Sequence, residues 1–353
     1  MPFVASYHGV ERLVVIGAGA AGLAAAAAGR RHGFEPLILD RGPGFGGAWA
    51  EMAPDMLCLS SRRHDVFPDG TVPAGLGEHA TATEVLAGLQ RIGSDGGYRV
   101  HFGTTVLGLR RESGAMLLET TIGPLRTRRV VVATGEWGRP YLPELPGCFE
   151  GPMQHSREVA AAEASRRFQP GEHVFIVGAG NSGSEVSLRA LAAGCHVTVS
   201  SRGPLQRPPL LLDGPLEGLR FWASGVRVAL LPGRGGCRDV TPLASHGFYD
   251  AVRDGRITWV SEAVALEGQG VKTRSDGTIR CDRVIFATGF RRDCAFLAGA
   301  CTLDARGAPV HGEGVSPEIP GLAVVGLPCM RTRRSGFLRG FVDDAMAVMR
   351  RIQ

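Results

Sequence analysis

The sequence is poor in lysine and in aromatic residues. Lys272 is the single lysine among 39 basic residues, and Phe, Trp and Tyr together make up 7% of the chain. The arginines are spread along the chain, and the basic stripe with interleaved aromatic side chains that is typical of nucleic-acid-binding surfaces is missing. Together with a modest net charge of +5, this argues against a nucleic-acid partner.

Paired cysteines are also missing. The eight cysteines are scattered, and no two of them have CxxC spacing. A zinc ribbon or a thioredoxin-like dithiol is therefore not predicted, and neither is a metal site. Dispersed thiols are typical of a reducing cytoplasm, where most are small buried hydrophobic residues. We expect a cytoplasmic protein in which Cys58, lacking a partner, is not a redox thiol.

No targeting segment or membrane anchor is evident. Residues 13–29, LVVIGAGAAGLAAAAAG, are apolar enough to resemble one, but no basic segment precedes them. Glycines interrupt the run, and Arg30 follows it. Because a strand that turns sharply into a helix explains this pattern better, no membrane partner is expected.

That turn has the features of a dinucleotide site. Residues 12–16 are predicted to form a buried parallel strand, and the alanine-rich residues 20–28 a helix. Between them, Gly17 permits a tight turn and Gly19 lets a pyrophosphate approach the backbone. Gly22 lets the helix lie close to the strand. The amides at the start of the helix favour an anion.

The strand that follows supports this interpretation. Residues 36–39 are predicted to form a second strand, which ends at Asp40. An acid about 20 residues beyond the glycines is expected to bind the hydroxyls of a ribose. A purely structural glycine turn is the alternative, but it does not account for the acid. We predict a dinucleotide with a free ribose at this turn.

A second turn with the same pattern lies in the middle of the chain. Residues 173–177 are predicted to form a strand, 184–193 a helix and 195–199 another strand. The glycines between the first two elements are Gly178, Gly180 and Gly183. The last strand runs into Ser201 and Arg202 instead of an acid, and an arginine can pair with a 2′-phosphate. We predict NADPH here; an exposed loop arginine is the alternative for Arg202.

Two similar segments, at 130–135 and 284–290, each read as a strand followed by Ala-Thr-Gly. They flank the second turn, and the proline-rich residues 138–147 suit a hinge. The sequence therefore predicts an α/β protein with two Rossmann-like domains, the NADPH-binding one inserted into the other. The predicted boundaries are 1–148 with 287–353 for the first domain and 149–286 for the second.

Further motifs make the chain similar to a known family. After GAGAAG comes GGAW, residues 46–49, and residues 149–155 read FEGPMQH, which matches the first seven positions of FxGxxxHxxx(F/Y/W). Val159 stands at the aromatic position. With GAGNSG and the late GLAVVGLP, the chain resembles class B flavin-dependent monooxygenases, above all their compact bacterial members and the plant type that oxygenates an indolic 2-oxo acid.

This resemblance implies FAD and NADPH as cofactors and O2 and a small molecule as co-substrates. NADPH would reduce the flavin, and a C4a-(hydro)peroxyflavin would then oxygenate a nitrogen, a sulfur or a carbonyl carbon, in specialised metabolism. The implied cofactor-binding residues are Gly17, Gly19, Ala21, Gly22, Asp40, Arg41, Gly47, Trp49, Val106, Ala133, Thr134, Gly135, Gly178, Gly180, Asn181, Ser182, Gly183, Ser201, Arg202, Thr288, Gly289 and Gly326.

Candidate catalytic residues also follow from the resemblance. Ser60 stands where many members carry an asparagine facing the flavin. Arg62 or Arg63, next to His64, is a candidate for binding a substrate carboxylate, with an exposed arginine pair as the alternative. His155 is expected to position the domains more than to transfer a proton.

Two other functions stay open at this point. One is an NAD(P)H-dependent flavoprotein reductase that passes electrons to a protein such as a ferredoxin. The other is a flavin-binding scaffold or sensor without turnover. The sequence does not identify the substrate. It is compatible with a homodimer but does not determine the oligomeric state.

Overall fold

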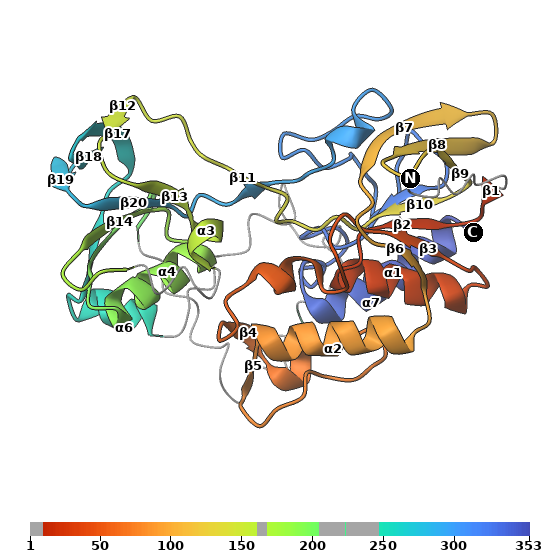
Figure 1. Ribbon diagram of the computed structural model, residues 1–353, viewed down its shortest axis with the longest axis horizontal. Coiled ribbons are helices and arrows are strands. Elements are labelled where there is room, and N and C mark those ends of the chain that lie inside the picture. Colours follow the sequence, from red (N-terminus) through yellow and green to blue (C-terminus); the bar gives the residue numbers. More distant parts are fainter. Residues whose placement is uncertain (1–9, 161–167, 205–222, 224–246) are drawn as a thin grey trace, which may run out of the picture.

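The computed structural model describes residues 10–160, 168–204, 223 and 247–353. Two parallel five-stranded sheets lie at opposite ends of the long axis (Figure 1). The first has the order β22 (Leu322–Val324), β10 (Val130–Val132), β2 (Val14–Ile16), β3 (Leu37–Leu39) and β6 (Arg99–His101). It takes strands from both ends of the chain, and its four strands from β22 to β3 are buried throughout.

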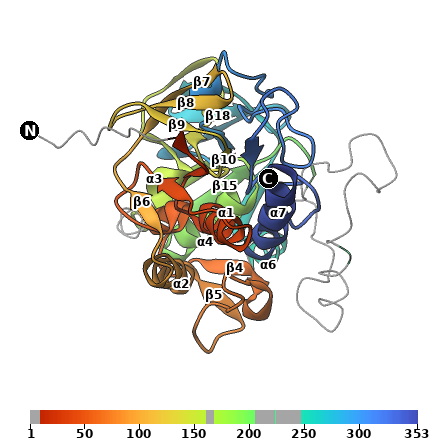
Figure 2. The same ribbon diagram turned by 90° about the vertical axis from the view of Figure 1, so that its right-hand side faces the viewer.

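Three helices cover one face of the first sheet: α1 (Ala20–Arg31), α2 (Ala82–Asp95) and α7 (Leu338–Arg351). Helix α1 lies between the other two (Figure 2). Its alanines let it lie close to the sheet, and a Cβ on Gly29 would overlap the side chain of Leu13 at 2.6 Å. This tight packing holds the last turn of α1 firmly against the start of β2.

The second sheet uses only strands from the middle of the chain. Its order is β13 (Met153–His155), β20 (Arg283–Phe286), β14 (His173–Val177), β15 (His196–Ser200) and β16 (Ile257–Val260). The helices that the described residues of this half form are α3 (Ser156–Ala160), α4 (Asn181–Ala192) and α6 (Phe248–Arg253). Helix α4 begins three residues before the predicted start because Gly180 is its N-cap residue.

Smaller elements extend each half. One antiparallel sheet carries β7 (Val106–Glu112), β8 (Ala115–Thr120) and β9 (Leu125–Thr127), with β1 (Val10–Glu11) added in parallel. A second small sheet contains β12 (Gly147–Phe149), β17 (Ala263–Gly268), β18 (Gly270–Thr273) and β19 (Thr278–Arg280), with β12 parallel to β17 and the other pairs antiparallel. The first half also holds β4 (Leu57–Ser61), β5 (His79–Thr81) and the short helices η1 (Gly47–Glu51), η2 (Arg62–His64) and η5 (Ala295–Leu297).

The chain crosses between the halves twice, and the two crossings pair with each other. Strands β11 (Arg139–Pro140) and β21 (Phe290–Arg291) run antiparallel, and the Tyr141 amide donates to the Gly289 carbonyl at 2.9 Å. Figure 1 shows β11 on the connection between the two ends of the molecule. The sequence prediction of an α/β fold with two Rossmann-like units is confirmed.

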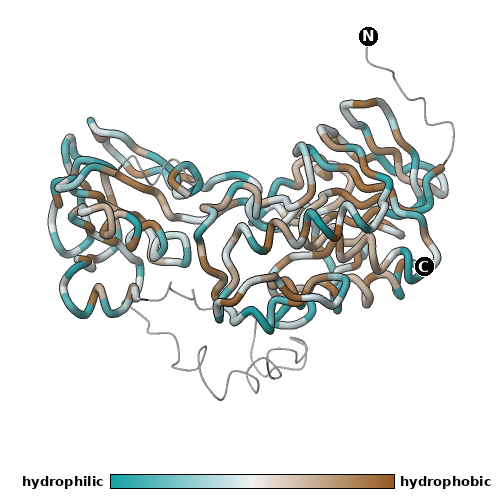
Figure 3. Tube along the Cα trace, turned by 60° about the horizontal axis from the view of Figure 1, so that its bottom comes forward, coloured by the Kyte–Doolittle hydropathy of each residue, from teal (hydrophilic) through white to brown (hydrophobic). Residues whose placement is uncertain are grey.

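Hydrophobic segments lie inside each half and hydrophilic ones outside (Figure 3). No helix formed by the described residues is long and apolar enough to cross a membrane. Six described cysteines are free, four of them buried, as expected. Cys329 differs from the prediction of single thiols because it is disulfide-bonded; Cys237 lies outside the described residues.

Candidate active site

The first glycine turn joins β2 to α1 and presents bare backbone. A Cβ on Gly17 (φ +114°) would overlap the Ala133 carbonyl oxygen, and one on Gly22 would overlap the carbonyl oxygen of Gly17. Among the described residues no side chain caps α1, so the amides of its first turn keep no partner within the helix. In contrast, Thr81 closes the start of α2 with a capping box. The turn therefore fits a pyrophosphate.

Asp40 lies beside this turn, at the end of β3. Its Oδ2 accepts a hydrogen bond from the Ala18 amide at 2.5 Å, and its Oδ1 accepts one from the Gly42 amide at 2.6 Å. A carboxylate can accept about four hydrogen bonds, so two remain for hydroxyl groups. This placement fits the predicted ribose contact. Arg41, predicted next to it, pairs instead with Asp293 at 2.8 Å.

Other residues predicted for the first cofactor surround the turn. Gly47 lies against Gly19, since a Cβ built on Gly19 would stand 3.6 Å from the Gly47 Cα. Trp49 is half-buried and packs at the edge of the hydrophobic cluster around Ala20. Gly326 contacts Ala21. The Thr134 hydroxyl lies 3.5 Å from the Cys294 sulfur, next to Gly135, whereas the Val106 side chain points into the core of the first half.

The second glycine turn repeats the geometry of the first. A Cβ on Gly178 (φ +105°) would overlap the Ala287 carbonyl oxygen, and one on Gly183 would overlap that of Gly178. Here too the described residues provide no side-chain cap at Gly180. The first helical residues, Asn181 and Ser182, are exposed. This turn also fits a phosphate-bearing ligand, at an open surface.

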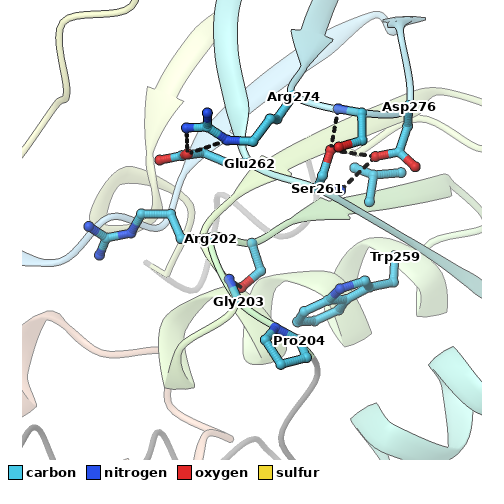
Figure 4. A pocket seen from close by; sticks show the side chains of 11 residues that line it. Arg202, Gly203, Pro204, Trp259, Ser261, Glu262, Arg274 and Asp276 are labelled. Atoms are coloured by element: carbon cyan, nitrogen blue, oxygen red, sulfur yellow. Dashed lines mark hydrogen bonds and ion pairs between the residues drawn. The ribbon is translucent and has the colours of Figure 1, made fainter.

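A pocket of about 350 Å³ lies where β15 and β16 end (Figure 4). Charged side chains occupy one side of it, and Trp259 with Pro204 occupies another. The lining residues are Ser201, Arg202, Gly203, Pro204, Trp259, Val260, Ser261, Glu262, Arg274, Ser275 and Asp276. Sequence reasoning found Ser201 and Arg202 only. Gly203 and Pro204 directly follow them, whereas the residues from Trp259 onward lie 55 or more residues further along the chain and reach the pocket through strand pairing.

The crossing segments position His155, which was predicted from the motif. Its ring is buried, its Nε2 bonds the Gly289 carbonyl at 3.0 Å, and its Nδ1 accepts from the Arg157 amide at 3.1 Å. These partners require a neutral ring with the proton on Nε2. Burial lowers the pKa of His155, which favours the same form. Both nitrogens are thus occupied, so the structure favours a positioning role over proton transfer. Beside it, the Thr288 hydroxyl bonds the Tyr141 carbonyl.

Ser60 lies on β4 and faces a buried carboxyl group. Its hydroxyl donates to Asp65 Oδ1 at 2.5 Å, and the Cys58 thiol lies beside the same carboxyl. Burial raises the pKa of Asp65 to about 6, although the bond from Ser60 opposes this rise. Sequence reasoning missed Asp65, because nothing in the local pattern marks this acid as buried.

The proposed role of Arg62 in substrate binding needs correction. All five of its N–H groups have acceptors: the carbonyls of Pro73, Ala74, Gly77 and His79, and the Glu84 carboxylate. Its side chain is only 12% exposed. Arg62 therefore holds a loop together, and a substrate carboxylate could reach it only by replacing these bonds. The neighbouring Arg63 Nε lies 3.3 Å from the His64 ring.

Two ion pairs join the halves next to the two turns. Arg157 of α3 pairs with Glu51 of η1. Arg189 of α4 binds Asp55 through two hydrogen bonds, at 2.8 and 3.3 Å. Arg189 is 15% exposed and Asp55 is 74% exposed. These contacts set the segment that follows Trp49 against the helices of the second half. Among the described residues no group of three or more acidic, His or Cys side chains could hold a metal ion.

Comparison with known proteins agrees with this geometry. The family model described as pyridine nucleotide-disulphide oxidoreductase matches residues 14–209. A flavin-containing monooxygenase from Stenotrophomonas maltophilia superposes with a TM-score of 0.79 and 25% identity, over 97% of each chain. A bacillithiol disulfide reductase from Staphylococcus aureus has a TM-score of 0.72 at 20% identity, over 96% of this chain and 97% of its own, a likeness of fold.

Sequence relatives extend the comparison. An uncharacterized CzcO-like oxidoreductase of Geobacillus kaustophilus is 25% identical over 94% of this chain and 95% of its own. The rice indole-3-pyruvate monooxygenase YUCCA1 is 27% identical over 80% of this chain and 77% of its own. FAD and NADPH, the predicted cofactors, are those that this family implies. These flavin monooxygenase relatives agree with the predicted resemblance to class B flavin-dependent monooxygenases. The chain is therefore an enzyme that belongs to the pyridine nucleotide-disulphide oxidoreductase family.

Proposed function

We propose that the protein is an NADPH-dependent FAD monooxygenase that transfers one oxygen atom from O2 to a small molecule. The observation that carries this proposal is the pair of uncapped glycine turns with opposite charges at the neighbouring strand ends. Asp40 suits a free ribose, whereas Arg202 suits a ribose that carries a phosphate. The monooxygenase relatives support the choice of reaction.

The first half would hold FAD. The amides from Gly19 to Gly22 would face the pyrophosphate, and Asp40 would accept from the ribose hydroxyls. Gly47 and Trp49 border the same turn. When bound, FAD supplies the redox ring and the site at which O2 reacts. The sheet membership supports the proposed division of the chain, with residues 149–286 as the NADPH-binding domain.

The second half would hold NADPH with its adenosine end in the pocket of Figure 4. Arg202 forms no hydrogen bond or ion pair with the described residues, so its guanidinium is available for the 2′-phosphate. Trp259 and Pro204 offer an apolar surface for the adenine. Amides at the start of α4 would face the pyrophosphate.

The protein's own contribution to the reaction is to position the cofactors and exclude water. Neutral His155 fixes the crossing segments by bonding Gly289. The ion pairs Arg157–Glu51 and Arg189–Asp55 keep the two halves together beside both turns. A closed, dry site limits wasteful loss of activated oxygen to water.

The substrate is proposed to be a soft nucleophile, such as an amine or a thioether, or a carbonyl compound. The rice relative is an indole-3-pyruvate monooxygenase, and thus acts on a 2-oxo acid. Recognition of such an acid needs a cation beside the flavin, and Arg62 is committed to its loop. Uncharged amines and sulfides are therefore favoured over carboxylates, for which only Arg63 of the predicted pair would remain. The proposed setting is specialised metabolism.

The test is reduction and reoxidation of the purified protein. It should be yellow, and NADPH should bleach it without oxygen. On admission of oxygen, stopped-flow spectra should show a transient species before the oxidised spectrum returns, and a true substrate should suppress peroxide release. If bleaching occurs but neither a transient nor coupling to any amine, sulfide or ketone is found, the monooxygenase proposal fails. A reductase that serves a ferredoxin-like acceptor would then fit better.

A further inference from the structure

The pocket of Figure 4 contains two cations and two anions, a balance that is unexpected for a site that binds a phosphate. Arg202 comes from the end of β15, whereas Arg274 comes from the turn between β18 and β19. Glu262 and Asp276 are the acids. Their charges offset those of the arginines, so the pocket as a whole gives a 2′-phosphate little net attraction.

The turn that carries Arg274 is held in place. Asp276 Oδ2 accepts from the Ser261 amide at 2.8 Å and from its hydroxyl at 2.5 Å, and the Ser275 amide donates to the Ser261 hydroxyl at 2.9 Å. These bonds keep the pKa of Asp276 below its usual value. Asp276 is therefore occupied by Ser261, and the turn presents Arg274 at a fixed place beside the pocket.

Glu262 is the acid that remains in contact with a cation of the pocket. Its Oε2 accepts from Arg274 Nε at 3.2 Å and from Nη2 as well. The side chains are 66% exposed for Arg274 and 30% exposed for Glu262. An ion pair this exposed to water is weak, so an incoming phosphate can compete with Glu262 for the guanidinium. The same carboxylate would repel that phosphate and could accept from the free ribose of NADH.

We propose that Glu262 and Arg274 set the preference between NADPH and NADH. Arg274 is the second cation for the 2′-phosphate, and Glu262 limits the preference for NADPH by holding Arg274 and by facing the phosphate with a like charge. This inference rests on the proposed function, because it takes the pocket as the adenosine end of the NADPH site. Arg202, which has no partner among the described residues, is the first cation.

The test measures binding of 2′,5′-ADP and 5′-AMP to the purified FAD-loaded full chain by calorimetry. The two probes differ only in the 2′-phosphate, and the readout needs no turnover. Glu262→Gln should raise the affinity ratio in favour of 2′,5′-ADP by about threefold to tenfold, and Arg274→Ala should lower it by a similar factor. Arg202→Ala should lower it at least as much.

Matched controls come from the same small sheet. Glu267→Gln removes an exposed carboxylate that pairs with Lys272, and Arg280→Ala removes an exposed guanidinium that bonds Gln269, both outside the pocket. Both should leave the ratio unchanged. If Arg202→Ala lowers the ratio while Glu262→Gln and Arg274→Ala do not change it, this inference is wrong and the NADPH site stands. If the wild type shows no preference for 2′,5′-ADP and Arg202→Ala has no effect, the proposed NADPH site fails, and this inference with it.

Discussion

The two glycine turns are built alike but are followed by different charges. In each, the first glycine donates its amide to the last carbonyl of the neighbouring strand: Gly17 to β3 at 2.8 Å, and Gly178 to β15 at 2.9 Å. Beyond those strands the chain continues with Asp40 in one case and reaches Arg202 in the other. The fold thus supplies the same phosphate cradle twice, and one charged side chain determines which ribose it favours.

The surroundings of the turns differ as well. Helix α1 is buried along almost its whole length between α2 and α7, whereas α4 begins with two exposed residues. An enclosed site suits a cofactor that stays bound through many turnovers. An open site suits a substrate that must leave after each one. This contrast agrees with FAD in the first half and NADPH in the second.

The largest expected effect comes from replacing a glycine with alanine in one turn at a time. The added methyl of Gly22→Ala would overlap the Gly17 carbonyl, and that of Gly183→Ala the Gly178 carbonyl. Overpacking of this kind costs about 1–3 kcal/mol or more, roughly a 5- to 150-fold loss of affinity. Gly22→Ala should purify with little flavin, measured as absorbance near 450 nm against that at 280 nm. Gly183→Ala should stay yellow but bind NADPH poorly.

The matched control is Gly44→Ala, because a Cβ on Gly44 meets nothing within 4 Å and its backbone is not left-handed. This variant should behave like the wild type in both measurements. A Gly183→Ala protein that lost its flavin, or a Gly22→Ala protein that kept flavin but lost NADPH binding, would reverse the assignment of the two sites.

Much of the assignment of the two turns could be predicted from the sequence because each turn is a local pattern. The strands, the glycines, Asp40 and Arg202 stand within a few tens of residues of one another, and glycine spacing constrains the backbone directly. The predicted ranges for β14 and the observed strand agree residue for residue. Helix α4 was placed three residues late, since the Asn-Ser pair after Gly180 favours a cap as much as a helix.

The residues that the sequence did not reveal are those set by long-range packing. Arg274 lines the same pocket as Arg202 only because β15 pairs with β16 and the chain turns after β18. Arg62 looked available because its acceptors lie 11 to 22 residues further on, in a loop with no regular pattern. The burial of Asp65 likewise depends on how β4 packs against α1 and α7.

An effect of intermediate size is expected in the pH dependence of the stability of the first half. Both buried aspartates among the described residues, Asp65 and Asp344, lie in the first half, and burial raises the pKa of each to about 6. Between about pH 4 and 6 the folded protein keeps a proton on Asp65 that the unfolded chain has lost. The free energy of unfolding therefore falls as the pH rises through this window, by up to about 3 kcal/mol for Asp65.

Asp65→Asn should remove the part of this fall in unfolding free energy that comes from Asp65, as measured by urea denaturation from pH 4 to 7. Asp69→Asn is the control of opposite sign, because hydrogen bonds from Thr71 and Arg91 lower the pKa of Asp69 despite its partial burial. Its carboxylate adds a small amount of stability, which is lost as the pH falls. The contribution is small because the group is largely exposed. Equal pH profiles for Asp65→Asn and wild type would mean that the pKa of Asp65 is the same in the folded and the unfolded protein.

The smallest expected effect concerns the link between the halves. Asp55→Asn breaks the two-bond contact with Arg189, which keeps its partner Glu185 on α4. An exposed pair of this kind contributes about 0–1 kcal/mol, so the rate of anaerobic flavin reduction by NADPH should fall no more than about fivefold. Salt should slow the wild type toward the variant's rate, because screening weakens the same contact.

The matched control is Asp250→Asn, which breaks the pair with Arg253 inside the second half. It should change neither the rate of flavin reduction nor its salt dependence. If Asp55→Asn reduces its flavin as fast as the wild type at every salt concentration, hydride transfer does not depend on this contact, and the paired crossings with the Arg157–Glu51 pair are enough to hold the two halves together.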